Sequence, residues 1–159
     1  MVQTTFTLRR FQPQDLQQVM HINQVCLPEN YSNYFFMDLY EHFPETFIVA
    51  EQDNQIVGYI MCRIETGFPD FGLLGIAKRG HVISIAVLPE HQRQGIGVAL
   101  MERAMQGMKL YKVKECFLEV RVSNKPALNL YAKLKFENER IMHGYYADGE
   151  GAYIMSRKL

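Results

Sequence analysis

Residues 88–101, LPEHQRQGIGVALM, place two glycines and an arginine in a short loop. The apolar run HVISIAVL precedes this loop, and a pattern typical of a helix follows it. The start of a helix exposes several unpaired N–H groups and carries a partial positive charge, so it attracts anions. Glycine lets a ligand approach the backbone closely and lets the loop curl its N–H groups around that ligand. The stretch therefore predicts a local anion-binding site.

The composition argues against a long-range electrostatic role for the whole chain. Its 159 residues include 17 Lys and Arg against 17 Asp and Glu, so the formal net charge is +0. No global field would recruit nucleic acid, an anionic membrane or an acidic partner. We therefore expect no direct nucleic-acid binding and no membrane association. The length and the 48% apolar content fit a single domain spanning residues 1–159.

The cysteines and the N-terminus indicate the compartment. Cys26, Cys62 and Cys116 are odd in number, lie far apart and lack a CxxC spacing, which favours reduced thiols over a disulfide framework or a zinc site. The N-terminal sequence MVQTTFTLRRF is polar, unlike a signal peptide. No apolar run approaches the roughly 20 residues needed to span a bilayer. We therefore expect a soluble cytoplasmic protein.

Hydrophobic periodicity predicts alternating strands and helices, with no repeat or linker that would divide the chain. The expected strands cover residues 5–10, 46–52, 56–65, 81–88, 115–120, 136–146 and 152–158. The expected helices cover residues 13–26, 34–43, 94–109 and 126–134. Residues 66–80, rich in glycine and proline, are expected to form a loop. The order β-α-α-β-β-β-α-β-α-β-β implies a mixed sheet with helices on both faces.

Two motifs resemble the GNAT acetyltransferase superfamily. QRQGIG (92–97) fits its Q/R-x-x-G-x-G/A signature, and a Walker A or dinucleotide-binding glycine pattern is absent. SNKPALNLYAKLKF (123–136) is similar to its helix N-x-x-A-x-x-L-Y-x-x-x-G/N-F, with Lys135 where glycine is common. The chain is identified as a member of this superfamily. The resemblance implies an α/β (α+β) GNAT fold: a mixed, mostly antiparallel sheet of about seven strands with a central parallel, splayed pair and helices on both faces.

Four further segments resemble protein N-terminal acetyltransferases, both the archaeal enzymes and the catalytic subunit of the eukaryotic NatA complex. These segments are LPENYSNYFF (27–36), RGHVISIAVL (79–88), LEVRVSN (118–124) and GYYADGEGAY (144–153). They lie outside the glycine loop, so they bear on which amine is acetylated. The resemblance implies transfer of an acetyl group from acetyl-CoA to the α-amine of a protein N-terminus, by direct attack of the amine on the thioester in a ternary complex.

On this resemblance the predicted anion is the pyrophosphate of acetyl-CoA. Backbone N–H groups of residues 93–98 would cradle it, and the pantetheine arm would pair with the strand edge at residues 85–87. The Val87 N–H would polarise the thioester carbonyl. Arg93 has the alternative of a solvated surface charge, and Asn124 that of a helix N-cap. The expected cofactor-binding residues are Ile85, Ala86, Val87, Arg93, Gln94, Gly95, Ile96, Gly97, Val98, Asn124 and Tyr131.

His81, Glu119 and Tyr131 are the candidate catalytic residues. His81 and Glu119 are expected at the ends of neighbouring apolar strands, as a base for the attacking amine. Glu119 has the alternative of an ion pair with Arg121 or Arg63, and His81 that of a hydrogen-bonded strand-end histidine. Tyr131 matches the family's general acid beside the CoA sulfur, with core packing as its alternative. Two such ligands do not make a zinc enzyme, so no metal is expected.

The resemblance also implies a short tunnel that accepts a chain terminus. The expected substrate-binding residues are Glu29, Tyr31, Tyr145 and Tyr146. The tyrosines, with Tyr34 and Phe35, would wall the first residue of the peptide, although core packing is the alternative for such aromatic side chains. Glu29 would shape the pocket for that residue and disfavour acidic ones.

Two other functions remain open at this level. One is a GNAT acetyltransferase acting on lysine side chains or on a small-molecule amine, which would have an open groove. The other is a catalytically silent acyl-CoA-binding module, which would have lost His81, Glu119 and Tyr131; all three are present, which argues against it. A monomer is expected. The sequence does not determine the preferred first residues, which of Glu119 and His81 is the working base, or whether an auxiliary subunit or a ribosome partner exists.

Overall fold

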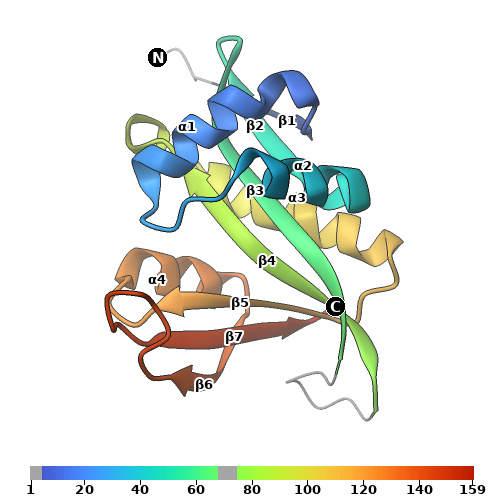
Figure 1. The fold of residues 1–159 in the computed structure, drawn as a ribbon, viewed down its shortest axis with the longest axis vertical. Helices are drawn as coiled ribbons and strands as arrows, with labels where there is room; N and C mark the ends of the chain where they lie inside the picture. Colours follow the sequence, from blue (N-terminus) through green and yellow to red (C-terminus); the bar gives the residue numbers. More distant parts are fainter. Residues whose placement is uncertain (1–4, 68–74) are drawn as a thin grey trace. The chain divides into compact units, whose positions relative to one another are not determined.

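The computed structural model describes residues 5–67 and 75–159. Its strands are β1 (Thr7–Arg10), β2 (Ile48–Gln52), β3 (Gln55–Gly67), β4 (Ala77–Val87), β5 (Glu115–Arg121), β6 (Glu137–Met142) and β7 (Ala152–Lys158). Its α-helices are α1 (Leu16–Cys26), α2 (Asn33–His42), α3 (Ile96–Leu110) and α4 (Lys125–Lys133). These elements follow the predicted order, and the strands form one sheet ordered β1-β2-β3-β4-β5-β7-β6 (Figure 1).

The sheet is mostly antiparallel, as predicted. β1 with β2, β2 with β3, β5 with β7 and β6 with β7 pair in antiparallel fashion. β4 and β5 form a parallel pair, in which residues 79–81 lie opposite residues 115–117. This register brings His81 beside β5, the strand that carries Glu119. The splay of β4 and β5 beyond His81 stays a prediction.

The chain forms two compact units, each built from separate segments. The first comprises Met1–Arg63 and Ile83–Gly107, and the second comprises Ile64–Val82 and Met108–Leu159. The chain passes from one unit to the other within β3, within β4 and within α3. The assignment of residues 1–159 to a single domain stays a prediction.

The core of the first unit is built by alternation along its strands. Val49, Tyr59 and Met61 are fully buried and belong to the core formed with α1 and α2. Ile48 and Ile60, which alternate with them, are fully buried on the opposite face. In Figure 1, α1 and α2 lie in front of β2 and β3, and α3 lies behind them. The prediction of helices on both faces therefore holds for this unit.

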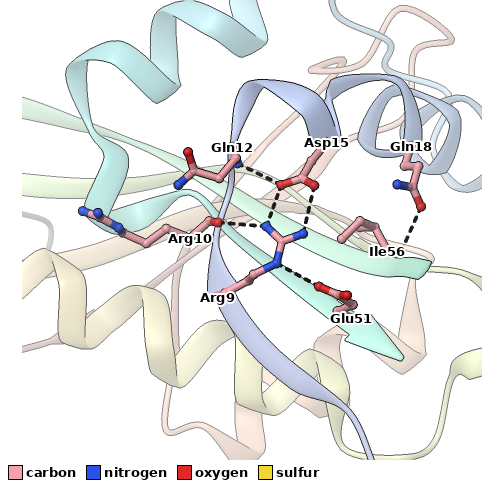
Figure 2. A network of polar contacts seen from close by, with 7 residues as sticks. All are labelled: Arg9, Arg10, Gln12, Asp15, Gln18, Glu51 and Ile56. Atoms are coloured by element: carbon pink, nitrogen blue, oxygen red, sulfur yellow. Dashed lines mark hydrogen bonds and ion pairs between the residues drawn. The ribbon is translucent and has the colours of Figure 1, made fainter. Parts of the chain in front are cut away.

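A charged cluster ties the first strand to the first helix (Figure 2). The guanidinium of Arg9 donates to both carboxylate oxygens of Asp15, at 2.7 and 2.9 Å, and its Nε donates to Glu51 at 2.8 Å. The backbone N–H of Gln12 also donates to Asp15, at 2.8 Å. Burial opposes ionisation of Asp15, but the bonds from Arg9 and Gln12 outweigh it and lower the pKa of this carboxyl. An ionised pair therefore fixes β1 and the turn before α1.

The loop predicted at residues 66–80 is shorter than expected. β3 continues to Gly67 and β4 begins at Ala77, so the prediction is wrong at both ends. The middle of this segment, residues 68–74, lies outside the described residues. Glycine and proline content overstates the loop because contacts with neighbouring elements override local propensity in strands.

Two side-chain arrangements explain the early start of β4. The Nε of Arg79 donates to the buried carboxylate of Glu115 on β5, at 2.9 Å. Gly80 faces Met108, and a Cβ on this glycine would collide with the methionine sulfur. The ion pair and the close approach of Met108 both require an extended chain here, so residues that resemble a loop in sequence form a strand.

The strand predicted at residues 136–146 is also shorter, because β6 ends at Met142. Gly144 has φ +63°, in the left-handed region that glycine adopts readily, and it ends the extended conformation. Tyr145 and Tyr146 therefore lie in the turn between β6 and β7 rather than in a strand.

Candidate active site

The predicted anion-binding loop lies between the end of β4 and the start of α3. After a short 3-10 turn at Pro89–His91, Arg93 has φ +64° and Gly95 has φ +85°. Both values lie in the left-handed region, which glycine adopts without the cost that arginine incurs. Successive N–H groups around left-handed residues form a concave anion site. Residues 96–98 follow as the first turn of α3, and binding of a pyrophosphate at this loop stays a prediction.

Side chains around this loop hold its conformation. Gln52, a buried residue at the end of β2, donates to the Gln94 side chain at 3.2 Å and bonds Nδ1 of His91 at 2.6 Å. Gln92 donates to the carbonyl oxygen of Val87 at 3.0 Å. Gln52 was not predicted to support the loop, although a polar residue at the end of an apolar strand was an available signal.

The predicted pantetheine edge, residues 85–87, is the last part of β4. Ala86 is buried in the core of the first unit, and Ile85 and Val87 are half-buried. The carbonyl oxygen of Val87 also accepts from the Cys26 thiol, at 3.6 Å. Burial raises the pKa of this thiol, so it stays protonated as a donor. The carbonyl of Val87 is thus fixed from two sides, which also fixes the direction of the adjacent backbone.

His81 lies between two carboxylates in the second unit. Its Nε2 is 2.7 Å from Oε2 of Glu119, and its Nδ1 is 2.7 Å from Oε2 of Glu65. The ring stacks on Phe117, with the two ring centres 4.3 Å apart. The side chains of His81 and Glu119 are 12% and 16% exposed, so solvent screens their interaction only partly. The prediction that His81 and Glu119 are neighbours is confirmed.

The structure corrects two details of that prediction. His81 is the fifth residue of β4 and Glu119 the fifth of β5, so both lie within their strands rather than at the ends. Glu65, on β3, was missed as a partner of His81. The signal was a carboxylate at the end of an apolar strand, but only the strand order places it beside the imidazole. Arg121, one of the two expected alternative partners of Glu119, bonds Asp148 and Glu150 in the turn between β6 and β7.

Asn124 and Tyr131 lie on or beside α4. The Asn124 side chain accepts a hydrogen bond from the Ala127 N–H at 3.2 Å, which confirms that Asn124 is the N-cap of α4. A contact between Asn124 and the cofactor stays a prediction. Tyr131 is buried and packs near Phe136, with ring centres 5.9 Å apart. Burial raises the pKa of the Tyr131 hydroxyl, which keeps it protonated at neutral pH. Lys135, at the position where the family commonly has glycine, adopts a left-handed φ of +65°.

Arg121 organises the turn that carries the two predicted tyrosines. One of its guanidinium nitrogens donates to Asp148 and to Glu150, at 2.9 Å in both cases. The guanidinium carbon lies 4.0 Å from the centre of the Tyr146 ring. Tyr146 in turn meets Tyr145 edge to face, with ring centres 4.9 Å apart. The Glu150 N–H and Arg121 lower the pKa of Asp148, so these charges persist at neutral pH.

Asn23 fixes the other predicted substrate segment, before α2. This buried side chain donates to the carbonyl of Glu29 at 3.0 Å and accepts from the N–H of Tyr31 at 3.4 Å. The Tyr31 ring stacks on Phe35 at 4.9 Å between centres. Tyr34, expected to help wall the peptide, is 80% exposed. Asn23 was not among the predicted site residues, although a polar side chain among the apolar positions of its helix was an available signal for a structural role.

The predicted site residues fall into both units. The segment with Glu29 and Tyr31, the strand edge at 85–87 and the glycine loop belong to the first; His81, Glu119, α4 and the tyrosine turn belong to the second. Within residues 5–67 and 75–159, no group of three or more His, Cys, Asp or Glu side chains is arranged to hold a metal ion. No helix in the described part of the chain is long and apolar enough to cross a membrane.

Sequence comparison identifies the family. Residues 16–136 match the Acetyltransferase (GNAT) family. The N-alpha-acetyltransferase of Saccharolobus solfataricus is 49% identical over 97% of this chain and 93% of its own length. The ARD1 subunit homolog of the N-terminal acetyltransferase complex of Dictyostelium discoideum is 36% identical over 94% of this chain and 71% of its own.

Solved structures agree with this fold. Ard1 from Thermoplasma volcanium superposes with a TM-score of 0.83, at 28% identity over 97% of each chain. Naa20 of Chaetomium thermophilum, solved with a bisubstrate analogue, gives a TM-score of 0.84 at 30% identity, over 96% of this chain and 86% of its own. With the glycine loop, the sheet order and these similarities together, the chain belongs to the GNAT acetyltransferase family.

Proposed function

We propose that this chain transfers an acetyl group from acetyl-CoA to the α-amine of protein N-termini. The single observation that carries the proposal is the contact between Nε2 of His81 and Oε2 of Glu119, at 2.7 Å, in a family whose acetyl donor is acetyl-CoA. Relatives named N-alpha-acetyltransferases, 41% to 49% identical over at least 88% of their length, support the terminal amine as the acceptor.

The glycine loop is proposed to bind the pyrophosphate. Backbone N–H groups of residues 93–98 would donate to its oxygens, because left-handed residues such as Arg93 and Gly95 can turn successive N–H groups toward one anion. The Arg93 side chain, exposed to solvent, would add charge from outside. Residues 85–87 would hold the pantetheine arm by main-chain hydrogen bonds, with Asn124 as a further contact.

The chemistry needs one proton removed and one delivered. Acetyl-CoA supplies a thioester whose acyl carbon the amine attacks, forming the amide C–N bond as the C–S bond breaks. Glu119 and His81 would take the proton from the amine nitrogen, and the Val87 N–H would stabilise the developing charge on the carbonyl oxygen. Tyr131 would give its proton to the departing sulfur. Tyr131 is buried beside Phe136, and a tyrosine, with an ordinary pKa of about 10, is protonated at neutral pH, as a donor must be at the start.

The first residues of the peptide are proposed to lie between two segments. Tyr31, held by Asn23, and the pair Tyr145 and Tyr146, held by Arg121, would wall the first residue and bond its backbone. Glu29 would face the first side chain. Each segment is anchored by a buried or multiply bonded polar residue, so the conformation of each segment is fixed by its own contacts.

We further infer that the chain acts as a monomer, with both units in one domain, in the reducing environment of the cytoplasm. Cys26, Cys62 and Cys116, all among the described residues, are thiols rather than disulfides, which suits that compartment. The continuity of β3, β4 and α3 from one unit into the other supports a single domain.

The proposed function is tested by incubating the chain with labelled acetyl-CoA and a panel of peptides that differ in residue one. Peptides with a blocked N-terminus and an exposed lysine form the second arm. We expect label on peptides with a free α-amine and little on the blocked lysine peptides. Faster labelling of the blocked peptides would assign the chain to the lysine acetyltransferases instead.

A further inference from the structure

The His81 imidazole is held by three side chains from two neighbouring strands. Glu65 on β3 meets Nδ1, Glu119 on β5 meets Nε2, and Phe117 on β5 stacks on the ring face. The side chain of Glu65 is 31% exposed and that of His81 12%. The ring plane and both in-plane directions are therefore defined by contacts, and rotation of the ring would break all three.

The number of N–H donors on the imidazole limits how protons can be arranged among Glu65, His81 and Glu119. A carboxylate only accepts hydrogen bonds, and a neutral imidazole donates from one nitrogen. A neutral imidazole can therefore donate to only one of its two carboxylate partners, each of which lies at 2.7 Å. At the Nδ1 contact, Glu65 is the more exposed carboxylate, and water stabilises its ionised form. When Nδ1 carries the imidazole proton and donates it to Glu65, Nε2 is left as the acceptor beside Glu119.

We propose that Glu65 is the positioning residue of this pair: it fixes the Nδ1–H of His81, so that Nε2 and Glu119 act together on one proton. The inference rests on the proposed function of His81 and Glu119. Glu65 would act through the imidazole without touching the substrate, in the way that a carboxylate orients the histidine of a Ser-His-Asp triad. Without Glu65 the ring could place its only proton on Nε2 and turn a donor toward Glu119.

The purely structural alternative is that Glu65 merely satisfies a half-buried histidine. Both readings predict some loss of stability when Glu65 is removed. They differ in the state of the ring, because only the positioning role requires Nδ1 to carry the proton whatever the pH. They differ also in kinetics, since a structural role would alter kcat only in proportion to the folded fraction.

The test compares the parent with Glu65→Leu and Glu65→Gln, using Glu137→Gln as a control for a carboxylate exposed on β6. Long-range ¹H–¹⁵N spectra of the resting protein, between pH 6 and 9, report which ring nitrogen of His81 is protonated. We expect a protonated Nδ1 throughout in the parent and in the control. In Glu65→Leu we expect the Nε2–H tautomer to become the major one.

Kinetics with acetyl-CoA and a peptide complete the test. We expect Glu65→Leu to lower kcat about 10–100-fold, the range seen when a partner that orients an active histidine is lost, with KM for acetyl-CoA unchanged. Glu65→Gln keeps an acceptor oxygen at the same reach, so it should recover most of that loss. Circular dichroism and the unfolding midpoint show whether each variant is folded at the assay temperature.

Two results would overturn the inference. One is the same His81 tautomer in the parent and in a folded Glu65→Leu. The other is a kcat for Glu65→Leu within about twofold of the parent. If the parent acetylates no N-terminal amine, the proposed function fails, but the spectra still decide whether Glu65 fixes the imidazole.

Discussion

The guanidinium of Arg121 lies 4.0 Å from the ring centre of Tyr146 while one of its nitrogens binds both Asp148 and Glu150. A single cation on β5 therefore holds the turn between β6 and β7 by charge and by stacking on an aromatic face. This turn carries Tyr145 and Tyr146, so the conformation of the proposed peptide wall depends on one residue outside it.

Replacing Arg121 by methionine should release the turn while leaving the cofactor loop intact. We expect KM for the peptide to rise about tenfold, and the affinity for acetyl-CoA to stay within about twofold of the parent. Steady-state kinetics and calorimetric titration with acetyl-CoA measure the two quantities. Lys133→Met, which removes an exposed cation from α4, is the control and should change neither. An unchanged peptide KM in folded Arg121→Met would remove the turn from the substrate site.

Gly95→Val tests the glycine loop. Gly95 has φ +85°, so valine there is strained, and a side chain would fill the space in which the pyrophosphate is proposed to bind. Acetyl-CoA binding should be lost. Gly75→Val is the matched control, because Gly75 has φ +80° and equally open surroundings. The control should show a similar strain cost in thermal unfolding but keep its acetyl-CoA affinity; equal affinity in both variants would refute the loop assignment.

Glu119→Gln and His81→Ala should each slow turnover by about 10²–10⁴-fold, the usual effect of losing a general base. Because Nε2 and Oε2 lie 2.7 Å apart on one proton path, the double variant should be much less impaired than the product of the two losses. The losses should also shrink as pH rises, since a larger fraction of the peptide α-amine, with an ordinary pKa near 8, is then neutral without help. Multiplicative, pH-independent losses would indicate two separate positioning roles.

The order of strands and helices could be predicted because hydrophobic periodicity follows from burial, and burial here alternates along the strands of the sheet. The adjacency of His81 and Glu119 could be predicted as well, once both strands were placed by resemblance. The role of Glu65 could not, because it depends on β3 lying beside β4, and nothing local in IMCRIE specifies that neighbour.

Other features were beyond prediction for a different physical reason. The left-handed conformation of Arg93 is set by its loop and not by its own propensity, which opposes it. Gln52 is a buried polar residue whose partners His91 and Gln94 belong to a distant segment, and buried Asn23 bonds the loop that follows its own helix. Such partners become visible only when the fold brings the segments together.

Asp15 gives a prediction about stability. Its pKa is lowered in the folded chain, so its ion pair with Arg9 stabilises the fold above the ordinary pKa of an aspartate, about 3.9, and is lost as pH falls through the lower folded value. Asp15→Asn should therefore cost about 1–3 kcal/mol at pH 7 and less at a pH below the ordinary value of about 3.9, as measured by urea unfolding. Asp53→Asn, in the exposed turn between β2 and β3, should be nearly neutral at both. A deficit in Asp15→Asn that is the same at both pH values would contradict the role of this charge.

Glu29→Ala tests the selection of the first residue. A carboxylate on Glu29 within about 4 Å of an acidic first residue would repel it by roughly 4 kcal/mol at an effective dielectric near 20, before relaxation. The variant should therefore raise the relative rate for acidic and bulky first residues across a peptide panel, with acetyl-CoA affinity unchanged. Glu41→Ala, exposed on α2, serves as the control. A variant that keeps the parent's ranking would show that Glu29 is not the selector.

The most direct measurement uses one peptide that offers both amines. A peptide with a free N-terminal serine and an internal lysine is incubated with acetyl-CoA and the chain, and tandem mass spectrometry locates the acetyl group. The proposed function predicts acetylation at the α-amine, with the lysine unmodified over the same time. The Glu119→Gln variant should give only a trace of acetylated product. Acetylation mainly at the lysine, or equally at both amines, would contradict it.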